Sequence, residues 1–122
     1  MAVKKILVVE DNATNRKLFT TILQIEHYEV FEAEDAVRGL ELARQYRPDL
    51  ILMDIQLPGM DGLTATRKLK EDLGLKDIPV LALTAFAMAG DHQKAIDAGC
   101  NGYISKPIKV ESFLEQIVPF LQ

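Results

Sequence analysis

Five short apolar segments recur at regular intervals along the chain, and they restrict the possible folds more than any other feature. Most are continuous apolar runs, which is typical of strands buried on both faces of a sheet. The segments are ILVV from Ile6, YEVFEA from Tyr28, LILM from Leu50, PVLALT from Pro79 and GYIS from Gly102. They predict five strands, of which YEVFEA has the weakest pattern.

Helical patterns lie between these segments. Three sets of apolar residues follow the three-and-four spacing of one helix face, which predicts amphipathic helices. The segment 63–73 has a weaker pattern, and the segment before Gly99 is interpreted as a further helix. The three clear sets are Leu18, Phe19, Ile22, Leu23 and Ile25; Val37, Leu40 and Ala43; and Val110, Phe113, Leu114, Ile117, Val118 and Leu121.

Local signals indicate where these helices begin and end. Asp35 is a suitable N-cap for the second helix, which should stop before Pro48. Gly99 is typical of a helix C-terminus. Pro119 conflicts with an unbroken last helix, so we expect that helix to end or kink near it.

Strand and helix therefore alternate five times along the chain. Short connections and right-handed crossovers predict a doubly wound, flavodoxin-like α/β fold, with a five-stranded parallel sheet and helices on both faces. The 122 residues are enough for one hydrophobic core. We expect a single domain over residues 1–122, with no output domain.

Charge and cysteine content argue against several classes of function. The chain has 14 basic and 18 acidic residues and a net charge of -4. Binding to nucleic acid or to an anionic membrane is disfavoured, because it requires clustered Lys and Arg. The one cysteine, Cys100, allows no intrachain disulfide, which suits a reducing compartment. The N-terminal apolar run is too short for a signal peptide or membrane insertion, so a cytoplasmic location is expected.

Polar residues follow the strands at the end where a parallel sheet binds its ligands. Glu10 and Asp11 follow the first strand, Asp54 the third, Thr84 the fourth and Lys106 the fifth. Taken singly, each has an ordinary explanation as a turn, cap or surface residue. Together the acids should repel one another, since two carboxylates ~4 Å apart cost about 4 kcal/mol at an effective dielectric constant of ~20.

A bound cation makes such a cluster of acids tolerable. A small number of oxygen ligands suits Mg²⁺, which keeps several of its waters. Zinc is disfavoured, because no cysteine or histidine clusters with these acids. The sequence therefore favours a magnesium site at the carboxyl edge of the sheet.

Four segments, in this order, resemble the motifs of response-regulator receiver domains, the CheY-like family, over the whole length of the chain. They are VVEDN from Val8, DLILMDIQLPGMDG from Asp49, ALTA from Ala82 and GYISKPI from Gly102. The stretches LTAFAMAGD and GCNGYISKP are especially similar to stand-alone cell-cycle receivers. The resemblance implies a phosphorylation-dependent switch of a two-component phosphorelay, which is no enzyme beyond catalysing its own phosphorylation and dephosphorylation.

The resemblance also implies roles for individual residues. Asp54 would accept a phosphoryl group from the phosphohistidine of a sensor histidine kinase or a histidine phosphotransfer protein. Glu10, Asp11 and Asp54 would hold Mg²⁺, aided by the backbone carbonyl of Gln56. Gln56 and Phe86 would border the phosphoryl group and tune how fast water attacks it.

Three further residues would connect the chemistry to a downstream protein target. Thr84 and Lys106 would contact the phosphoryl oxygens, and the Lys106–Pro107 bond would be cis. Tyr103 would be the aromatic residue that changes rotamer when Thr84 moves towards the phosphoryl group. The expected output surface is the fourth helix, the fifth strand and the fifth helix.

The family implies the strand order 2-1-3-4-5, which explains the residue types at the strand ends. The third strand then lies between the first and the fourth, ~4.8 Å from each, so the short side chains of Asp11 and Thr84 suffice beside Asp54. The fifth strand is two spacings away, ~10 Å. Only a long side chain such as Lys106 can reach back from there.

Other classes of protein fit the sequence less well. Aspartate-nucleophile phosphatases carry a motif that resembles D-x-D-x-T after a buried strand. Here Gln56 stands in place of the second aspartate and Pro58 in place of the threonine. A flavodoxin-like FMN site needs a phosphate-binding loop after the first strand, where EDNATN would repel a phosphate. The nucleotide-binding motif G-x-x-x-x-G-K-[ST] is absent. A receiver module from a hybrid histidine kinase stays open as an alternative.

Overall fold

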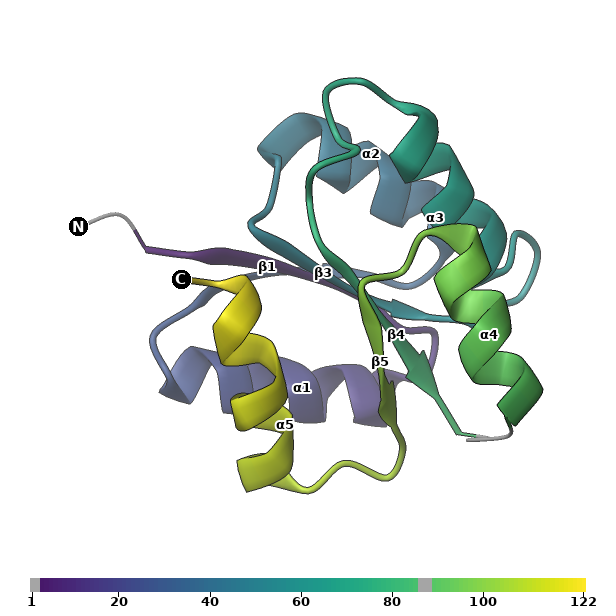
Figure 1. The fold of residues 1–122 in the computed structure, drawn as a ribbon. Coiled ribbons are helices and arrows are strands. Elements are labelled where there is room, and N and C mark those ends of the chain that lie inside the picture. Colours follow the sequence, from purple (N-terminus) through teal and green to yellow (C-terminus); the bar gives the residue numbers. More distant parts are fainter. Residues whose placement is uncertain (1–2, 86–88) are drawn as a thin grey trace.

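The structure, a computed structural model, describes residues 3–85 and 89–122. Its centre is one parallel sheet whose strands lie in the order β2-β1-β3-β4-β5 (Figure 1). The predicted fold class and the strand order implied by the resemblance are therefore confirmed. The strands are β1 (Lys5–Val9), β2 (Glu29–Ala33), β3 (Leu50–Asp54), β4 (Val80–Thr84) and β5 (Gly102–Ser105).

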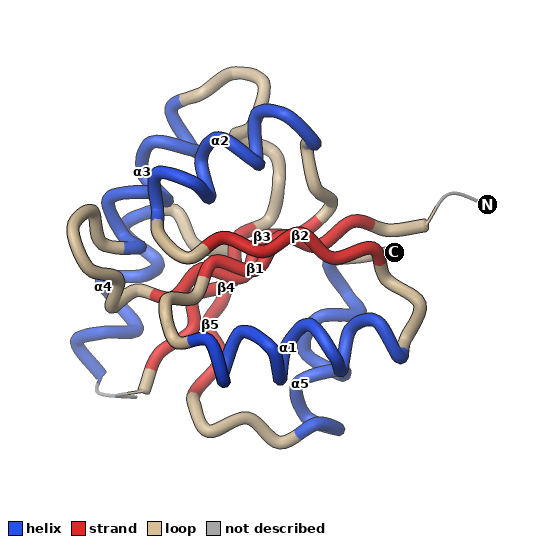
Figure 2. Tube along the Cα trace, turned by 180° about the vertical axis from the view of Figure 1, so that it is seen from behind, coloured by secondary structure: helices blue, strands red, loops and turns tan. Residues whose placement is uncertain are grey.

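Helices cover both faces of this sheet. In Figures 1 and 2, α2, α3 and α4 lie on one face and α1 and α5 on the other, so the sheet is the middle of three layers. Among the described residues, no helix combines the length and the apolar character needed to cross a membrane. The helices are α1 (Ala13–Ile25), α2 (Ala36–Tyr46), α3 (Gly62–Glu71), α4 (Ala89–Ala98), α5 (Val110–Ile117) and the 3-10 turn η1 (Val118–Phe120).

Side-chain caps start three of the helices. Asn12, Asp35 and Asp61 accept hydrogen bonds from the backbone N–H groups three residues further on, at 2.9, 2.8 and 2.8 Å. These bonds satisfy donors that the first turn of a helix leaves unpaired. The predicted cap at Asp35 is confirmed, and so is the predicted end of this helix before Pro48, because α2 ends at Tyr46.

The predicted ends of the last two helices are also confirmed. Gly99, directly after α4, has a φ of +105°, a conformation that favours glycine. The helix α5 ends at Ile117, and Pro119 lies in the 3-10 turn that follows. Proline ends the α-helix here because it has no N–H group to donate.

The apolar interior is divided by the sheet into two layers. The central strands β3 and β4 are buried at every residue, whereas in the edge strand β2 only Ala33 is buried. This difference explains why the β2 segment has the weakest apolar pattern. One layer of side chains packs under α2, α3 and α4, and the other, which includes Phe19 and Phe113, packs under α1 and α5.

The predicted apolar faces of the helices are wider than the observed ones, and this part of the prediction is wrong. Five residues assigned to those faces are exposed, because they lie at the margin of the stripe that touches the sheet. Spacing gives the direction of a stripe, but the neighbouring element decides its width. The exposed residues are Leu18, Ile25, Val37, Val110 and Val118.

The strand register brings the polar strand ends level. Val9 pairs with Met53, Asp54 with Leu83, and Thr84 with Ser105. Residues that are far apart in the sequence therefore end their strands at one edge of the sheet, and the residue after each strand enters the same region.

Candidate functional site

Three acids meet at the carboxyl edge of the sheet. Glu10, Asp11 and Asp54 each offer a carboxylate oxygen, and these oxygens lie within 4.8 Å of one another. Glu10 is 1% exposed and Asp54 is 4% exposed, while Asp11 is exposed to solvent. The cluster thus has a buried floor and one acid at its opening.

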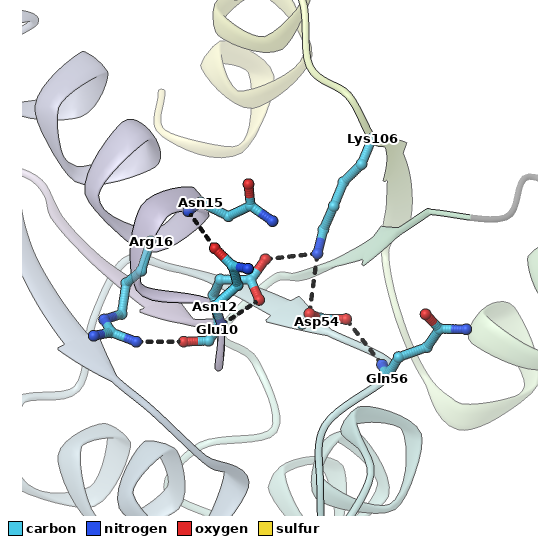
Figure 3. Close-up of polar contacts among 7 residues, drawn as sticks. All are labelled: Glu10, Asn12, Asn15, Arg16, Asp54, Gln56 and Lys106. Atoms are coloured by element: carbon cyan, nitrogen blue, oxygen red, sulfur yellow. Dashed lines mark hydrogen bonds and ion pairs between the residues drawn. The ribbon is translucent and has the colours of Figure 1, made fainter.

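Lys106 reaches this cluster from the end of β5. Its Nζ lies 2.6 Å from Glu10 Oε1 and 3.0 Å from Asp54 Oδ2, so it bridges the acids of β1 and β3 (Figure 3). The peptide bond between Lys106 and Pro107 is cis, as the resemblance implied. The long side chain spans the intervening strand β4, and its charge partly offsets that of the three acids.

Backbone groups hold the remaining oxygens of the two buried acids. The N–H of Asn12 donates to Glu10 Oε2 at 3.2 Å, and the N–H of Gln56 donates to Asp54 Oδ1 at 2.9 Å (Figure 3). The loop after Gln56 returns so close to β3 that a Cβ at Gly62 would collide with the carbonyl oxygen of Asp54. The glycine therefore allows α3 to start directly behind the site.

The acid cluster carries more negative charge than Lys106 balances. Burial, followed by the contact with Asp54, raises the pKa of Glu10 from 4.5 to about 7. Burial by itself would lower the pKa of Lys106, but its hydrogen bonds to Glu10 and Asp54 outweigh this and raise it. Oxygen ligands, two of them buried, with excess negative charge are a suitable environment for Mg²⁺.

The structure also places the other predicted site residues. Thr84 is the last residue of β4 and is 3% exposed, and its carbonyl accepts a hydrogen bond of 2.7 Å from the N–H of Lys106. Tyr103 in β5 is half-buried and pairs with Ala82 of β4, and the centroid of its ring lies 4.2 Å from that of His92 in α4. Phe86 lies outside the described residues.

One residue that contacts the site was not predicted from the sequence. Arg16, in α1, donates from Nη1 to the backbone carbonyl of Glu10 at 2.9 Å. A signal for it exists: Arg16 is three residues before Phe19 and seven before Leu23, on the face of α1 that points to the sheet. A cation on the core-facing side of a helix requires a buried acceptor.

A hollow of about 390 Å³ opens beside the Lys106 side of the site. It lies between α1 and the loop that follows β5. Its lining is Asn15, Leu18, Phe19, Ala85, Lys106, Pro107 and Ile108. A bound molecule could therefore contact Leu18 and Lys106 at the same time.

Comparisons with known proteins agree on the family. The family model described as "Response regulator receiver domain" matches residues 6–118. The "Polar-differentiation response regulator DivK" of Brucella anthropi is 49% identical over 118 residues, which cover 97% of this chain and 96% of that protein. DivK of Brucella ovis is 48% identical over the same shares of the two chains.

Solved structures show the same fold. The Vibrio cholerae chemotaxis protein CheY4 has a TM-score of 0.94 and 29% identity, and the match covers 98% of this chain and 100% of that one. The receiver domain of the sensor histidine kinase PA1611 from Pseudomonas aeruginosa has a TM-score of 0.91 and 34% identity, with 98% of each chain covered. That structure holds a magnesium ion coordinated in its active site cleft.

Proposed function

Since this chain belongs to the response regulator receiver family and is a receiver domain of two-component signalling, we propose that Asp54 is its phosphoacceptor. The observation that carries the proposal is the position of Asp54. Asp54 ends the central strand β3. Lys106 donates a hydrogen bond to one of its carboxylate oxygens, and the N–H of Gln56 donates to the other. Glu10 and Asp11 each offer a carboxylate oxygen within 4.8 Å of one of its own, so Asp54 lies among the charged groups that a phosphoryl transfer needs.

The proposed reaction moves a phosphoryl group from a phosphohistidine to Asp54. An oxygen of Asp54 attacks phosphorus, the P–N bond breaks, and the imidazole leaves with the electron pair and takes up a proton. Lys106, which is already directed at Asp54, would follow the charge onto the phosphoryl oxygens. Thr84, at the end of the neighbouring strand, would donate its hydroxyl to the same group. Such transfers depend mainly on positioning and on charge stabilisation.

Glu10, Asp11 and Asp54 would hold the magnesium ion, and the carbonyl of Gln56 would complete the protein ligands. When bound, the ion supplies positive charge that screens the phosphoryl oxygens from the acids. The fit rests on the acid cluster itself, in which Glu10 and Asp54 are buried and burial raises the pKa of Glu10 to about 7. The magnesium in the Pseudomonas aeruginosa receiver supports the same use of this edge.

A mass measurement tests the phosphoacceptor. Wild-type protein with Mg²⁺ and a small acyl phosphate should gain one phosphate, and the Asp54→Asn variant should gain none. Asp61→Asn is the matched control, because Asp61 is an exposed acid on the loop that follows Asp54. A full adduct on Asp54→Asn, or an undiminished reaction in excess EDTA, would show that the assignment is wrong.

The phosphodonor would dock along α1. Four of the exposed residues of this helix follow spacings of four, three and four, which places them on one side of the helix. One of them, Leu18, lines the hollow beside Lys106. This spacing suits the packing of a partner helix, as a histidine kinase or histidine phosphotransfer protein could provide. The four residues are Thr14, Leu18, Thr21 and Ile25.

The docking proposal has its own test. Leu18→Asp should slow transfer from a phosphohistidine protein about tenfold or more, because it places a charge in an apolar contact. It should leave transfer from a small acyl phosphate unchanged, since that donor needs no docking surface. Val37→Asp, at an exposed position on the opposite face of the sheet, is the control. Equal rates for Leu18→Asp and wild type with the protein donor would contradict the proposal.

The signal would leave by contact with another protein. A shift of the Thr84 hydroxyl towards the phosphoryl group would open space for the Tyr103 ring, and the output surface would be α4, β5 and α5. The net charge of -4 disfavours direct binding to nucleic acid. The protein would catalyse at most its own phosphorylation and dephosphorylation.

A further inference from the structure

Arg16 links the acid cluster to the edge strand β2. Its Nη1 donates to the carbonyl oxygen of Glu10 at 2.9 Å, and its Nε lies 3.4 Å from Glu32 Oε1. The side chain of Arg16 is 15% exposed and that of Glu32 is 45% exposed. In Figure 3, Arg16 reaches Glu10 from the side opposite to Lys106.

The bond from Arg16 restrains more than one residue. The carbonyl of Glu10 belongs to the peptide group that joins Glu10 to Asp11, and this group is planar. Its orientation therefore limits the backbone of both residues, and with it the directions in which the two carboxylates leave the chain. The N–H of Glu10 is also bound to β2, through the carbonyl of Ala33 at 3.1 Å.

Without such a restraint the acids would move apart. Their oxygens lie within 4.8 Å of one another, and like charges at this distance repel. Asp11 is the exposed member, so it is free to turn outwards unless its backbone is held. The hydrogen bond from Arg16 opposes this movement from behind the cluster.

We propose that Arg16, oriented by Glu32, is a positioning residue that presets the carboxylates of Glu10 and Asp11 for a divalent cation. The inference rests on the proposed metal role of these acids. Mg²⁺ requires a nearly octahedral arrangement of ligands, whereas Ca²⁺ accepts irregular ones. Loss of the restraint should therefore weaken Mg²⁺ binding more than Ca²⁺ binding.

Charge and geometry predict opposite signs for the effect of Arg16. A guanidinium repels a divalent cation, so its removal would strengthen metal binding if charge were its whole contribution. If Arg16 acts by holding the Glu10 peptide, its removal should weaken metal binding. Lys17 offers a matched control, since it is the next cation along α1 and its side chain is exposed.

The experiment is a titration of the folded protein with Mg²⁺ and, separately, with Ca²⁺, followed by amide NMR. Arg16→Met should bind Mg²⁺ about tenfold more weakly, the usual loss when a group that orients a metal ligand is removed. Its loss of Ca²⁺ affinity should be smaller. Glu32→Gln should show the same pattern about two- to threefold, because it loosens Arg16 without removing it. Lys17→Met should bind Mg²⁺ as tightly as wild type or slightly more tightly.

A lysine at this position sharpens the result. Arg16→Lys keeps the charge, but its compact ammonium cannot hold two partners in the fork of a guanidinium. We expect an Mg²⁺ affinity between those of wild type and Arg16→Met. If Arg16→Met is unfolded at the measuring temperature, Glu32→Gln and Arg16→Lys carry the same test.

Two results would overturn the inference. Arg16→Met that binds Mg²⁺ as tightly as wild type, or more tightly, would show that Arg16 does not position the acids. Equal losses for Mg²⁺ and Ca²⁺ would show a general structural effect. Failure of the metal site itself is recognised separately, because Asp11→Ala and Asp54→Asn would then also bind Mg²⁺ like wild type.

Discussion

The carboxyl edge of the sheet and the face formed by α4, β5 and α5 hold their side chains in different ways. At the edge, each of the two oxygens of Glu10 and of Asp54 accepts a hydrogen bond. On the face formed by α4, β5 and α5, Tyr103 is half-buried and contacts the ring of His92. A hollow of about 380 Å³, lined by Tyr103 and by residues of β5 and α5, lies beside it.

This difference fits the two tasks that we propose, a group transfer at the edge and a switch at the face that carries Tyr103. A group transfer is fast when charges and donors are already in place before the reaction. A switch needs a part of the structure that has two arrangements of similar free energy. The strand β5 connects the two regions, since it carries Tyr103 and leads into Lys106.

The largest expected effect is the pH dependence of stability that the buried carboxyl of Glu10 causes. The pKa of Glu10 is raised from 4.5 to about 7. Between these two pH values, the folded protein therefore holds a proton that the unfolded chain has released. This contribution to stability is complete below the unfolded pKa and is lost as the pH rises through the folded one. In EDTA, the loss should amount to up to about 3 kcal/mol.

Urea unfolding at several pH values measures this loss. Glu10→Gln should remove most of it, and added Mg²⁺ should reduce it in wild type by neutralising the acids. Glu26→Gln, at an exposed position at the end of α1, is the control. If wild type and Glu10→Gln lose stability in parallel as the pH rises, the ionisation of Glu10 does not destabilise the folded protein.

The second effect removes one acid of the proposed metal site without disturbing the core. Asp11→Ala should weaken Mg²⁺ binding about a hundredfold, because a carboxylate a few ångströms from the ion contributes several kcal/mol. Since Asp11 is exposed, the variant should fold normally. Calorimetric titration measures the affinity, with Asp77→Ala as a surface control. Unchanged binding by Asp11→Ala would reduce the acids to turn and cap residues.

The third effect separates the two regions. Thr84→Ala should still accept phosphate at Asp54, yet the shift of the Tyr103 NMR signals on phosphorylation should correspond to a roughly tenfold smaller change in population. Thr84→Ser keeps the hydroxyl and should behave like wild type. Phosphorylation is followed by intact mass on the same samples. A full Tyr103 response in Thr84→Ala would mean that the coupling takes another route.

The smallest effect concerns the output face alone. His92→Ala should leave the phosphorylation rate unchanged and should alter the distribution of Tyr103 rotamers by a few tenths of a kcal/mol, because the ring contact is partly exposed. NMR of the Tyr103 ring measures the distribution. His27→Asn, which removes the other histidine, should have no effect on it. A slower phosphorylation of His92→Ala would contradict the division into two regions.

Much of the fold was predictable because its signals are local. The burial of β3 follows from the run Leu50–Asp54, and the start of α2 follows from Asp35. The width of the helix stripes was not predictable, as exposed Val37 shows. It depends on how closely a helix approaches the sheet, which no short window of sequence contains.

The same division holds within the candidate site. By itself, the sequence determined that acids, a hydroxyl and a lysine follow the strands, because strand ends are marked by neighbouring residues. The tertiary structure decided that Glu10 is buried between two donors while Asp11 is exposed, and that Arg16 holds the peptide between them. The contact of Glu10 with Lys106 joins residues 96 positions apart, and the pairing of Arg16 with Glu32 joins a helix to the edge strand. Such contacts depend on distances that exist only after the sheet and its helices have packed together.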